Sequence, residues 1–192
     1  TEKTNITIIT PKGAAFDAKI LDINRTGDSV KCAVMKDGGD DPDVTTGALI
    51  YAEVRLSDAK GIRLDGGEGV GRVTRPGLDQ PVGAAAINSV PRTMIKQEIT
   101  EVAELCGYDG GFDVIISAPE GEEIASRTFN PRLGIEGGIS IIGTSGVVEP
   151  MSEQAILDTI RVELRQQKAE GCKVSFTSPG NYGQDFMKVN YG

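Results

Sequence analysis

Acidic side chains are densest between residues 37 and 43, around Pro42. The segment holds four carboxylates, Asp37, Asp40, Asp41 and Asp43. Clustered carboxylates can serve as general bases or hold a divalent cation. A calcium loop of the EF-hand type requires a different spacing of acids and glycine. Three interpretations remain: a catalytic site, a metal site of another kind, and a turn in which the Asp side chains accept hydrogen bonds from nearby backbone N–H groups.

A basic segment stands out in a chain whose formal net charge is −8. Between residues 69 and 96 the only acidic residue is Asp79, and the basic residues are Arg72, Arg75, Arg92 and Lys96. Arg132, in a turn next to Pro131, belongs with this group. An arginine binds a carboxylate with two parallel hydrogen bonds, so these residues suit a ligand that carries carboxylates. An ordinary solvated surface is the alternative.

The composition excludes several classes of function. The chain has 192 residues and no histidine, which removes Ser-His-Asp and Cys-His catalysis. The negative net charge argues against a nucleic-acid partner, which needs a basic surface. The three cysteines form no C-x-x-C pair, so we expect neither a disulfide framework nor a zinc site. No apolar run reaches the roughly 20 residues that cross a bilayer, and we expect a cytoplasmic protein with no membrane partner.

Glycine and proline recur in six short segments that combine turn-forming residues with a few charges. The segments are residues 39–45, 71–78, 86–92, 130–135, 137–152 and 178–183. Functional groups are often carried on such turns, held by a rigid scaffold. Together and in this order, from about residue 37 to the end of the chain, the segments resemble the cobalt-precorrin-5B C1-methyltransferase family of anaerobic cobalamin biosynthesis, CbiD.

The resemblance implies an activity, its partners and part of its site. The implied reaction transfers a methyl group from S-adenosylmethionine to C-1 of a cobalt-bearing tetrapyrrole, cobalt-precorrin-5B, and gives cobalt-precorrin-6A. The cobalt belongs to the substrate, and we expect no protein-bound metal. The resemblance also places catalytic groups at Asp40, Asp41 and Asp43. Contacts to the substrate, which is edged with acetate and propionate groups, are expected from Arg75, Arg92, Arg132 and Asn130.

The resemblance also concerns the extent of the chain. Family members begin with a small-residue segment around a Thr-Gly-Thr-Cys-Ala-Ala motif and continue well past an Asn-Tyr-Gly turn. Neither part is present in this sequence. We therefore expect a middle piece of a longer protein, one that folds but is a poor catalyst alone.

The first part of the chain has the pattern of a β-sheet. Short β-favouring runs cover residues 4–10, 18–24, 29–35, 49–56 and 61–64. Hairpin turns are predicted at residues 25–28 and 57–60. Residues 66–71 are rich in glycine but lack the spacing of a phosphate-binding loop, so we interpret them as a flexible connection.

A helix follows, with Pro91 in its first turn and Gly107 as its C-terminal cap. Its apolar residues recur with helical spacing at Ile95, Ile99, Val102 and Cys106. Residues 112–118 and 122–128 are then predicted as a second hairpin.

The last third predicts a strand–helix–strand unit. The strands are residues 139–142 and 172–177, and the helix between them is capped by Ser152 and ends at Gly171, with a buried stripe of Ile156, Leu157, Ile160 and Leu164. Ligands of such units bind beyond the carboxyl ends of the strands. We therefore expect S-adenosylmethionine contacts at Gly143, Thr144, Ser145, Gly146, Glu149, Pro179, Gly180 and Asn181.

The sequence thus predicts an α+β fold, with an antiparallel or mixed β-rich N-terminal part followed by a Rossmann-like βαβ unit. The predicted boundary divides residues 1–108 from 109–192. Homo-oligomer formation stays open. Two other functions also stay open: a module that binds a tetrapyrrole or adenosyl ligand without chemistry, and a hydrolase or lyase that uses the aspartate cluster and a divalent metal.

Overall fold

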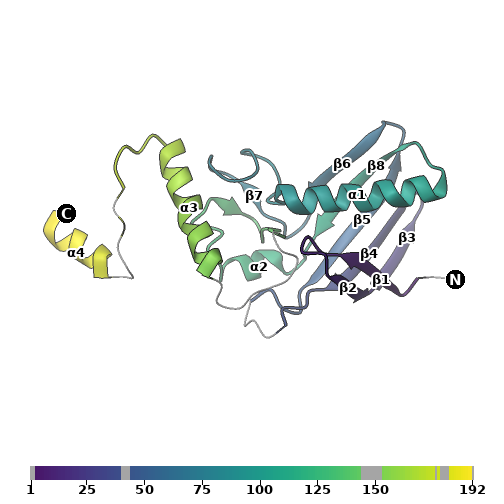
Figure 1. Cartoon of the computed structure of the whole chain (residues 1–192), viewed down its shortest axis with the longest axis horizontal. Coiled ribbons are helices and arrows are strands. Elements are labelled where there is room, and N and C mark those ends of the chain that lie inside the picture. The colour runs from purple at the N-terminus through teal and green to yellow at the C-terminus, as the bar shows by residue number, and fades with distance from the viewer. Residues whose placement is uncertain (1–2, 40–43, 144–152, 176, 178–181, 192) are drawn as a thin grey trace.

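The computed structural model of the chain describes residues 3–39, 44–143, 153–175, 177 and 182–191. Its centre is a five-stranded mixed sheet with the strand order β3-β4-β5-β8-β6 (Figure 1). The strands are β3 Leu21–Thr26, β4 Ser29–Met35, β5 Leu49–Ser57, β8 Gly111–Ser117 and β6 Gly61–Gly66. Two smaller sheets pair β1 Asn5–Ile9 with β2 Ala15–Lys19, and β7 Arg72–Val73 with β9 Ile135–Glu136. The α+β class predicted from the sequence is confirmed.

The sheet departs from the prediction at β5 and β6. Residues 57–60 were expected to join these strands as a hairpin, but β8 lies between the two. It pairs antiparallel with β5 and parallel with β6. The parallel pair is connected through helix α1, Ser89–Cys106. A boundary after residue 108 would separate β8 from both of its partners.

Helix α1 covers one face of the sheet (Figure 1). It begins two residues before Pro91 and ends at Gly107, whose φ of 63° is left-handed, as predicted. Ile95 and Ile99 pack against a buried cluster that contains Val114 and Ile116 of β8. Val102 and Cys106, the other two residues of the predicted apolar face, are exposed.

Residues 66–71 pack closely against two other backbone segments, residues 118–121 and 138–139. Gly69 accepts a hydrogen bond from the backbone N–H of Ile139, and Gly71 donates one to the carbonyl of the same residue. A Cβ atom added at Gly69 would overlap the carbonyl oxygen of Ala118. One added at Gly121 or Gly138 would overlap the carbonyl oxygen of Gly69. The interpretation of this segment as a connection missed the role of its glycines, which permit close backbone contact.

The last part of the chain differs most from the prediction. The second predicted hairpin is wrong, because helix α2, Gly121–Ala125, follows β8. Residues 139–142 make only isolated bridges, at Ile139 and Ile141. The described residues 172–175 and 177 form no strand. The Rossmann-like unit is not confirmed, since a parallel strand needs neighbouring strands to pair with.

Two helices complete the chain, α3 Glu153–Ala169 and α4 Tyr182–Tyr191. Helix α3 occupies nearly the predicted range; its predicted cap, Ser152, lies outside the described residues. The stripe predicted to be buried is 62%, 48%, 42% and 42% exposed at Ile156, Leu157, Ile160 and Leu164. That prediction is wrong for the chain as it stands. Over the residues that the structure describes, no helix has the length and apolarity to span a membrane.

Candidate functional site

The predicted catalytic segment is described only at its edges. Asp37 is exposed, and its carboxylate accepts a hydrogen bond of 2.8 Å from the backbone N–H of Gly39, as expected for an Asp turn. Asp40, Asp41 and Asp43 lie outside the described residues. Their catalytic role therefore stays a prediction.

The predicted cofactor loops are described at a single residue. Gly143 has a φ of 57°, and a Cβ atom added there would lie 3.3 Å from the ring of Pro91 in the first turn of α1. The loop therefore begins beside the N-terminus of that helix. The other predicted contacts lie outside the described residues: Thr144, Ser145, Gly146, Glu149, Pro179, Gly180 and Asn181.

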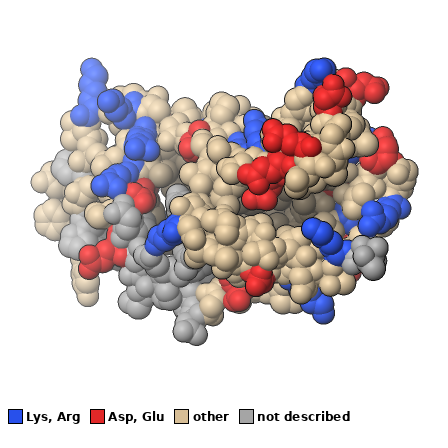
Figure 2. Space-filling model, turned by 45° about the vertical axis from the view of Figure 1, so that its right-hand side comes forward, with Lys and Arg blue, Asp and Glu red and all other residues tan. Residues whose placement is uncertain are grey.

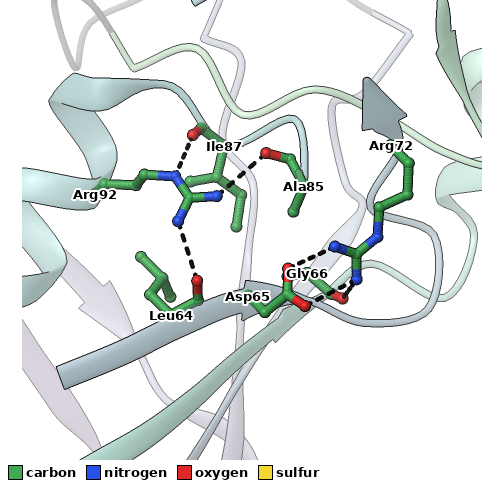
Figure 3. Close-up of polar contacts among 7 residues, drawn as sticks. All are labelled: Leu64, Asp65, Gly66, Arg72, Ala85, Ile87 and Arg92. Carbon is green, nitrogen blue, oxygen red and sulfur yellow. Dashed lines mark hydrogen bonds and ion pairs between the residues drawn. The ribbon is translucent and has the colours of Figure 1, made fainter. Parts of the chain in front are cut away.

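Arg92 makes structural contacts. Its Nε donates to the carbonyl of Ile87 at 2.7 Å, Nη1 to Leu64 at 3.0 Å and Nη2 to Ala85 at 3.2 Å (Figure 3). These carbonyls belong to β6 and to the segment that leads into α1. One guanidinium thus joins the end of the strand to the start of the helix. Three of its N–H groups donate to backbone carbonyls, which favours a structural role for Arg92 over substrate binding.

Arg72 is paired with an acid. Its guanidinium donates to both carboxylate oxygens of Asp65, at 2.6 and 3.0 Å, and to the carbonyl of Gly66 at 2.7 Å (Figure 3). The hydrogen bond from Arg72 is the main cause that holds the pKa of Asp65 below its usual value. Burial acts in the opposite direction, and the backbone N–H of Gly66 reinforces the lowering. This pair fixes β7 beside the end of β6.

The Asp65 pKa predicts a pH dependence of stability. The pKa of Asp65 is lower in the folded state than in the unfolded state. The ion pair with Arg72 therefore stabilises the fold above about pH 4, and this stabilisation is lost as the pH falls through the folded-state pKa. The side chains are about half exposed, at 43% and 51%, so we expect at most about 1 kcal/mol. Urea unfolding measures the free energy of unfolding of wild type and Asp65→Asn between about pH 2 and 7. The difference between the two proteins should shrink as the pH falls. Asp109→Asn, in a far more exposed pair with Lys60, serves as the control; a difference independent of pH would contradict the assignment.

Asn130 is also used by the fold. The residue is 8% exposed. Its Nδ2 donates to the carbonyl of Gly138 at 3.1 Å, and its Oδ1 accepts a hydrogen bond of 3.2 Å from Ser140. Its backbone carbonyl accepts from Ile135. The side chain therefore ties the turn at residues 130–134 to the segment after β9.

Arg75 and Arg132 are the two predicted substrate arginines that the structure brings together. Arg75 Nη1 donates to the carbonyl of Arg132 at 3.4 Å, and both side chains are exposed. Gly134 makes this contact close, because a Cβ atom added there would lie 2.6 Å from the Arg75 side chain. The guanidinium of Arg132 lies 5.9 Å from the ring centroid of Phe129, which is 63% exposed. Sequence reasoning missed Phe129, since a single aromatic residue in a turn carries no pattern.

The arrangement around Arg75 and Arg132 can bind an anion beside an apolar surface. Neither arginine makes an ion pair with any residue that the structure describes. Two guanidinium groups on adjacent turns provide donors for carboxylates, and Phe129 provides an apolar face. Within the described ranges, no group of three or more potential metal ligands is found.

Sequence comparisons give close relatives. The model of the CbiD family matches residues 1–150. A cobalt-precorrin-5B C(1)-methyltransferase from Ruminiclostridium cellulolyticum is 51% identical over 187 residues, which cover 97% of this chain and 48% of the relative. A protein of the same name from Alkaliphilus metalliredigens is 50% identical over 190 residues, covering 99% and 50%. The chain therefore spans about half the length of these curated relatives.

A solved structure is similar in fold. It is the 1.9 Å crystal structure of the cobalamin biosynthesis protein CbiD from Archaeoglobus fulgidus, with a TM-score of 0.55 and 26% identity. The match covers 83% of this chain and 50% of that one. The family model, the sequence relatives and the fold agree with the resemblance carried by the six glycine- and proline-containing segments. The chain belongs to the CbiD family.

Proposed function

We propose that the protein to which this chain contributes transfers a methyl group from S-adenosylmethionine to C-1 of cobalt-precorrin-5B and forms cobalt-precorrin-6A. The observation that carries the proposal is the identity of about half of all aligned positions with proteins of that name, over nearly the whole chain. Several relatives at this level share the same name. The proposal concerns a step of cobalamin biosynthesis in the cytoplasm.

The proposed chemistry relies on position. A bond forms between the methyl carbon and C-1 while the bond between that carbon and the sulfonium sulfur breaks, and the sulfur leaves as S-adenosylhomocysteine. The nucleophilic carbon, the methyl group and the sulfur must lie in line, and correct orientation can supply several kcal/mol of the barrier, on the order of 7–11. The cobalt enters with the tetrapyrrole.

Roles for individual residues follow from the family motifs and the described contacts. Arg75 and Arg132 are proposed to hold substrate carboxylates, because their donors face solvent. Asn130 supports the turn from which Arg132 projects, and Arg92 joins the end of β6 to the start of α1. Asp40, Asp41 and Asp43 stay the proposed catalytic groups. The donor is proposed to bind at the loops that contain Gly143, Thr144, Ser145, Gly146 and Glu149, and Pro179, Gly180 and Asn181.

The donor site also requires the predicted strand–helix–strand unit. We propose that residues 139–142 and 172–177 become neighbouring parallel strands when a longer protein supplies the rest of their sheet. Two observations support this proposal. Helix α3 forms where predicted, and its apolar stripe is exposed, as expected of a helix whose sheet is incomplete.

A chimera tests the function. This chain would replace the 187 aligned residues of the Ruminiclostridium cellulolyticum relative, and product formation from cobalt-precorrin-5B would be followed with and without S-adenosylmethionine. We expect turnover that requires the donor and is unaffected by a chelator such as EDTA. The 192-residue chain alone should be at least about 100-fold slower, because small errors of position reduce rates that much.

The two alternatives give different results in this assay. A binding module would bind the tetrapyrrole or the donor in a folded chimera and release no methylated product. A metal-dependent hydrolase or lyase would act without S-adenosylmethionine and stop with the chelator. Either result would contradict the proposed methyl transfer.

A further inference from the structure

Helix α3 docks on the two turns that carry Arg75 and Arg132. Gln166 of α3 donates through Nε2 to the carbonyl of Leu133 at 2.5 Å, and Gln166 is 5% exposed. On the other turn, a Cβ atom added at Gly77 would lie 2.8 Å from the Gln166 Cα and 3.1 Å from the Arg165 carbonyl carbon. Gly77 has a φ of 96°. The turns and the helix therefore approach each other at backbone distance.

This docking brings the backbone of a third arginine to the turns that carry the first two. Arg165 precedes Gln166 and is exposed. Like Arg75 and Arg132, it makes no ion pair with any residue in the described part of the chain. Figure 2 shows Lys and Arg side chains at the end of the molecule that carries α3 and α4 (left), and others at the opposite end. Three arginines that make no ion pair with a described residue therefore lie on adjoining segments, the two turns and α3.

The turns that carry Arg75 and Arg132 also carry exposed apolar residues. Pro76 follows Arg75, and Phe129 and Pro131 precede Arg132; all three are exposed. Arg132 lies over the Phe129 ring. A flat apolar ligand can cover such residues, while carboxylates at its edge reach the guanidinium groups. A small anion that lacks an apolar ring would not bury the exposed Phe129 side chain.

We propose that Arg75, Arg132 and Arg165 form one site for a planar, polycarboxylated ring, and that Arg165 is a substrate-binding residue supplied by α3. The inference rests on the proposed function, whose substrate has this chemistry. It adds a residue that no sequence motif indicates, because Arg165 meets the turns only through the docking of α3. It also assigns Gln166 and Gly77 a positioning role, since both hold the helix against the turns.

Uroporphyrin, a planar tetrapyrrole edged with acetate and propionate groups, tests the site through its fluorescence. It would be titrated into the chain and into Arg165→Gln, which keeps a helix-forming side chain. Arg127→Gln, in the turn after α2, where the arginine is paired with Glu123, removes the same charge from a residue outside the proposed site. We expect about tenfold weaker binding for Arg165→Gln, as for the loss of one charge-assisted hydrogen bond. The control should bind like wild type, and the thermal midpoints of all three should agree.

The ligand chemistry is tested separately. The methyl ester of uroporphyrin keeps the ring and lacks the charge, so it should bind at least about tenfold more weakly than the acid. Equal binding of the acid by all three proteins, or equal binding of acid and ester, would overturn the proposal. A single-stranded oligonucleotide that binds more tightly than uroporphyrin would overturn it in favour of nucleic acid.

The inference and the proposed function fail in different ways. If Arg165→Gln weakens uroporphyrin binding and the chimera shows no methyl transfer, the carboxylate site stands and the function is wrong. If the chimera transfers methyl groups and Arg165→Gln changes neither uroporphyrin binding nor the KM for the tetrapyrrole, the function stands and the site is wrong.

Discussion

Gly69→Ala should unfold the protein or destabilise it by more than about 4 kcal/mol. The added Cβ would overlap the carbonyl oxygen of Ala118 and approach the backbone of Gly121. Both neighbours are backbone atoms, which no side-chain rotation can move away. Separating them would also break the hydrogen bond between the Ala118 N–H and the Glu68 carbonyl, 2.8 Å long. Urea unfolding followed by circular dichroism measures the loss.

Gly27→Ala separates the clash from backbone strain. Gly27 has a φ of 59°, close to the 69° of Gly69, but no atom lies within 4 Å of its added Cβ. The control should therefore cost only the strain of a left-handed conformation, about 1–2 kcal/mol. If the two variants lost the same stability, the packing of backbone segments at Gly69 would not be as tight as described.

Arg92→Met should destabilise the protein by about 3 kcal/mol. Methionine keeps most of the aliphatic length and removes the donors that satisfy the carbonyls of Leu64, Ala85 and Ile87. These acceptors are partly buried, so losing a charged donor leaves a desolvation cost. The free energy of unfolding in urea gives the magnitude.

Arg63→Met is the matched control. Arg63 pairs with Asp113 on the sheet, and its side chain is 65% exposed, so its loss should cost less than about 1 kcal/mol. If Arg92→Met kept wild-type stability and instead weakened tetrapyrrole binding, the role in substrate binding expected from the sequence would be correct and the structural role wrong.

Local patterns in the sequence predicted much of the fold. The run at β4 and the helix between Pro91 and Gly107 follow from residue spacing and from caps within the same segment. The position of β8 does not. Its insertion between β5 and β6 depends on pairing with residues about 50 positions away, and no turn or periodicity encodes that choice. Tertiary context also decided residues 121–125, which form α2 because both edges of β8 are already occupied.

The sequence predicted a chemistry for the candidate site, which stays a prediction, and it could not determine which arginines belong to the site. The sequence indicated that arginines on turns would bind carboxylates. It could not distinguish Arg92, which meets three backbone carbonyls, from Arg75, which faces solvent. Their neighbours in the sequence are similar, and only the folded chain determines what each guanidinium meets. Arg165 was missed for the same reason, because it reaches the site through helix docking.

We propose that this chain supplies about half of a methyltransferase that acts at C-1 of the tetrapyrrole. The most direct measurement incubates the chimera with cobalt-precorrin-5B and S-adenosylmethionine labelled with carbon-13 in the methyl group. Carbon NMR of the product then reports which carbon has gained the label. We expect one labelled methyl group on C-1, formed within about tenfold of the rate of the parent enzyme. A folded chimera that leaves the label on the donor, or places it on another carbon, would contradict methyl transfer to C-1.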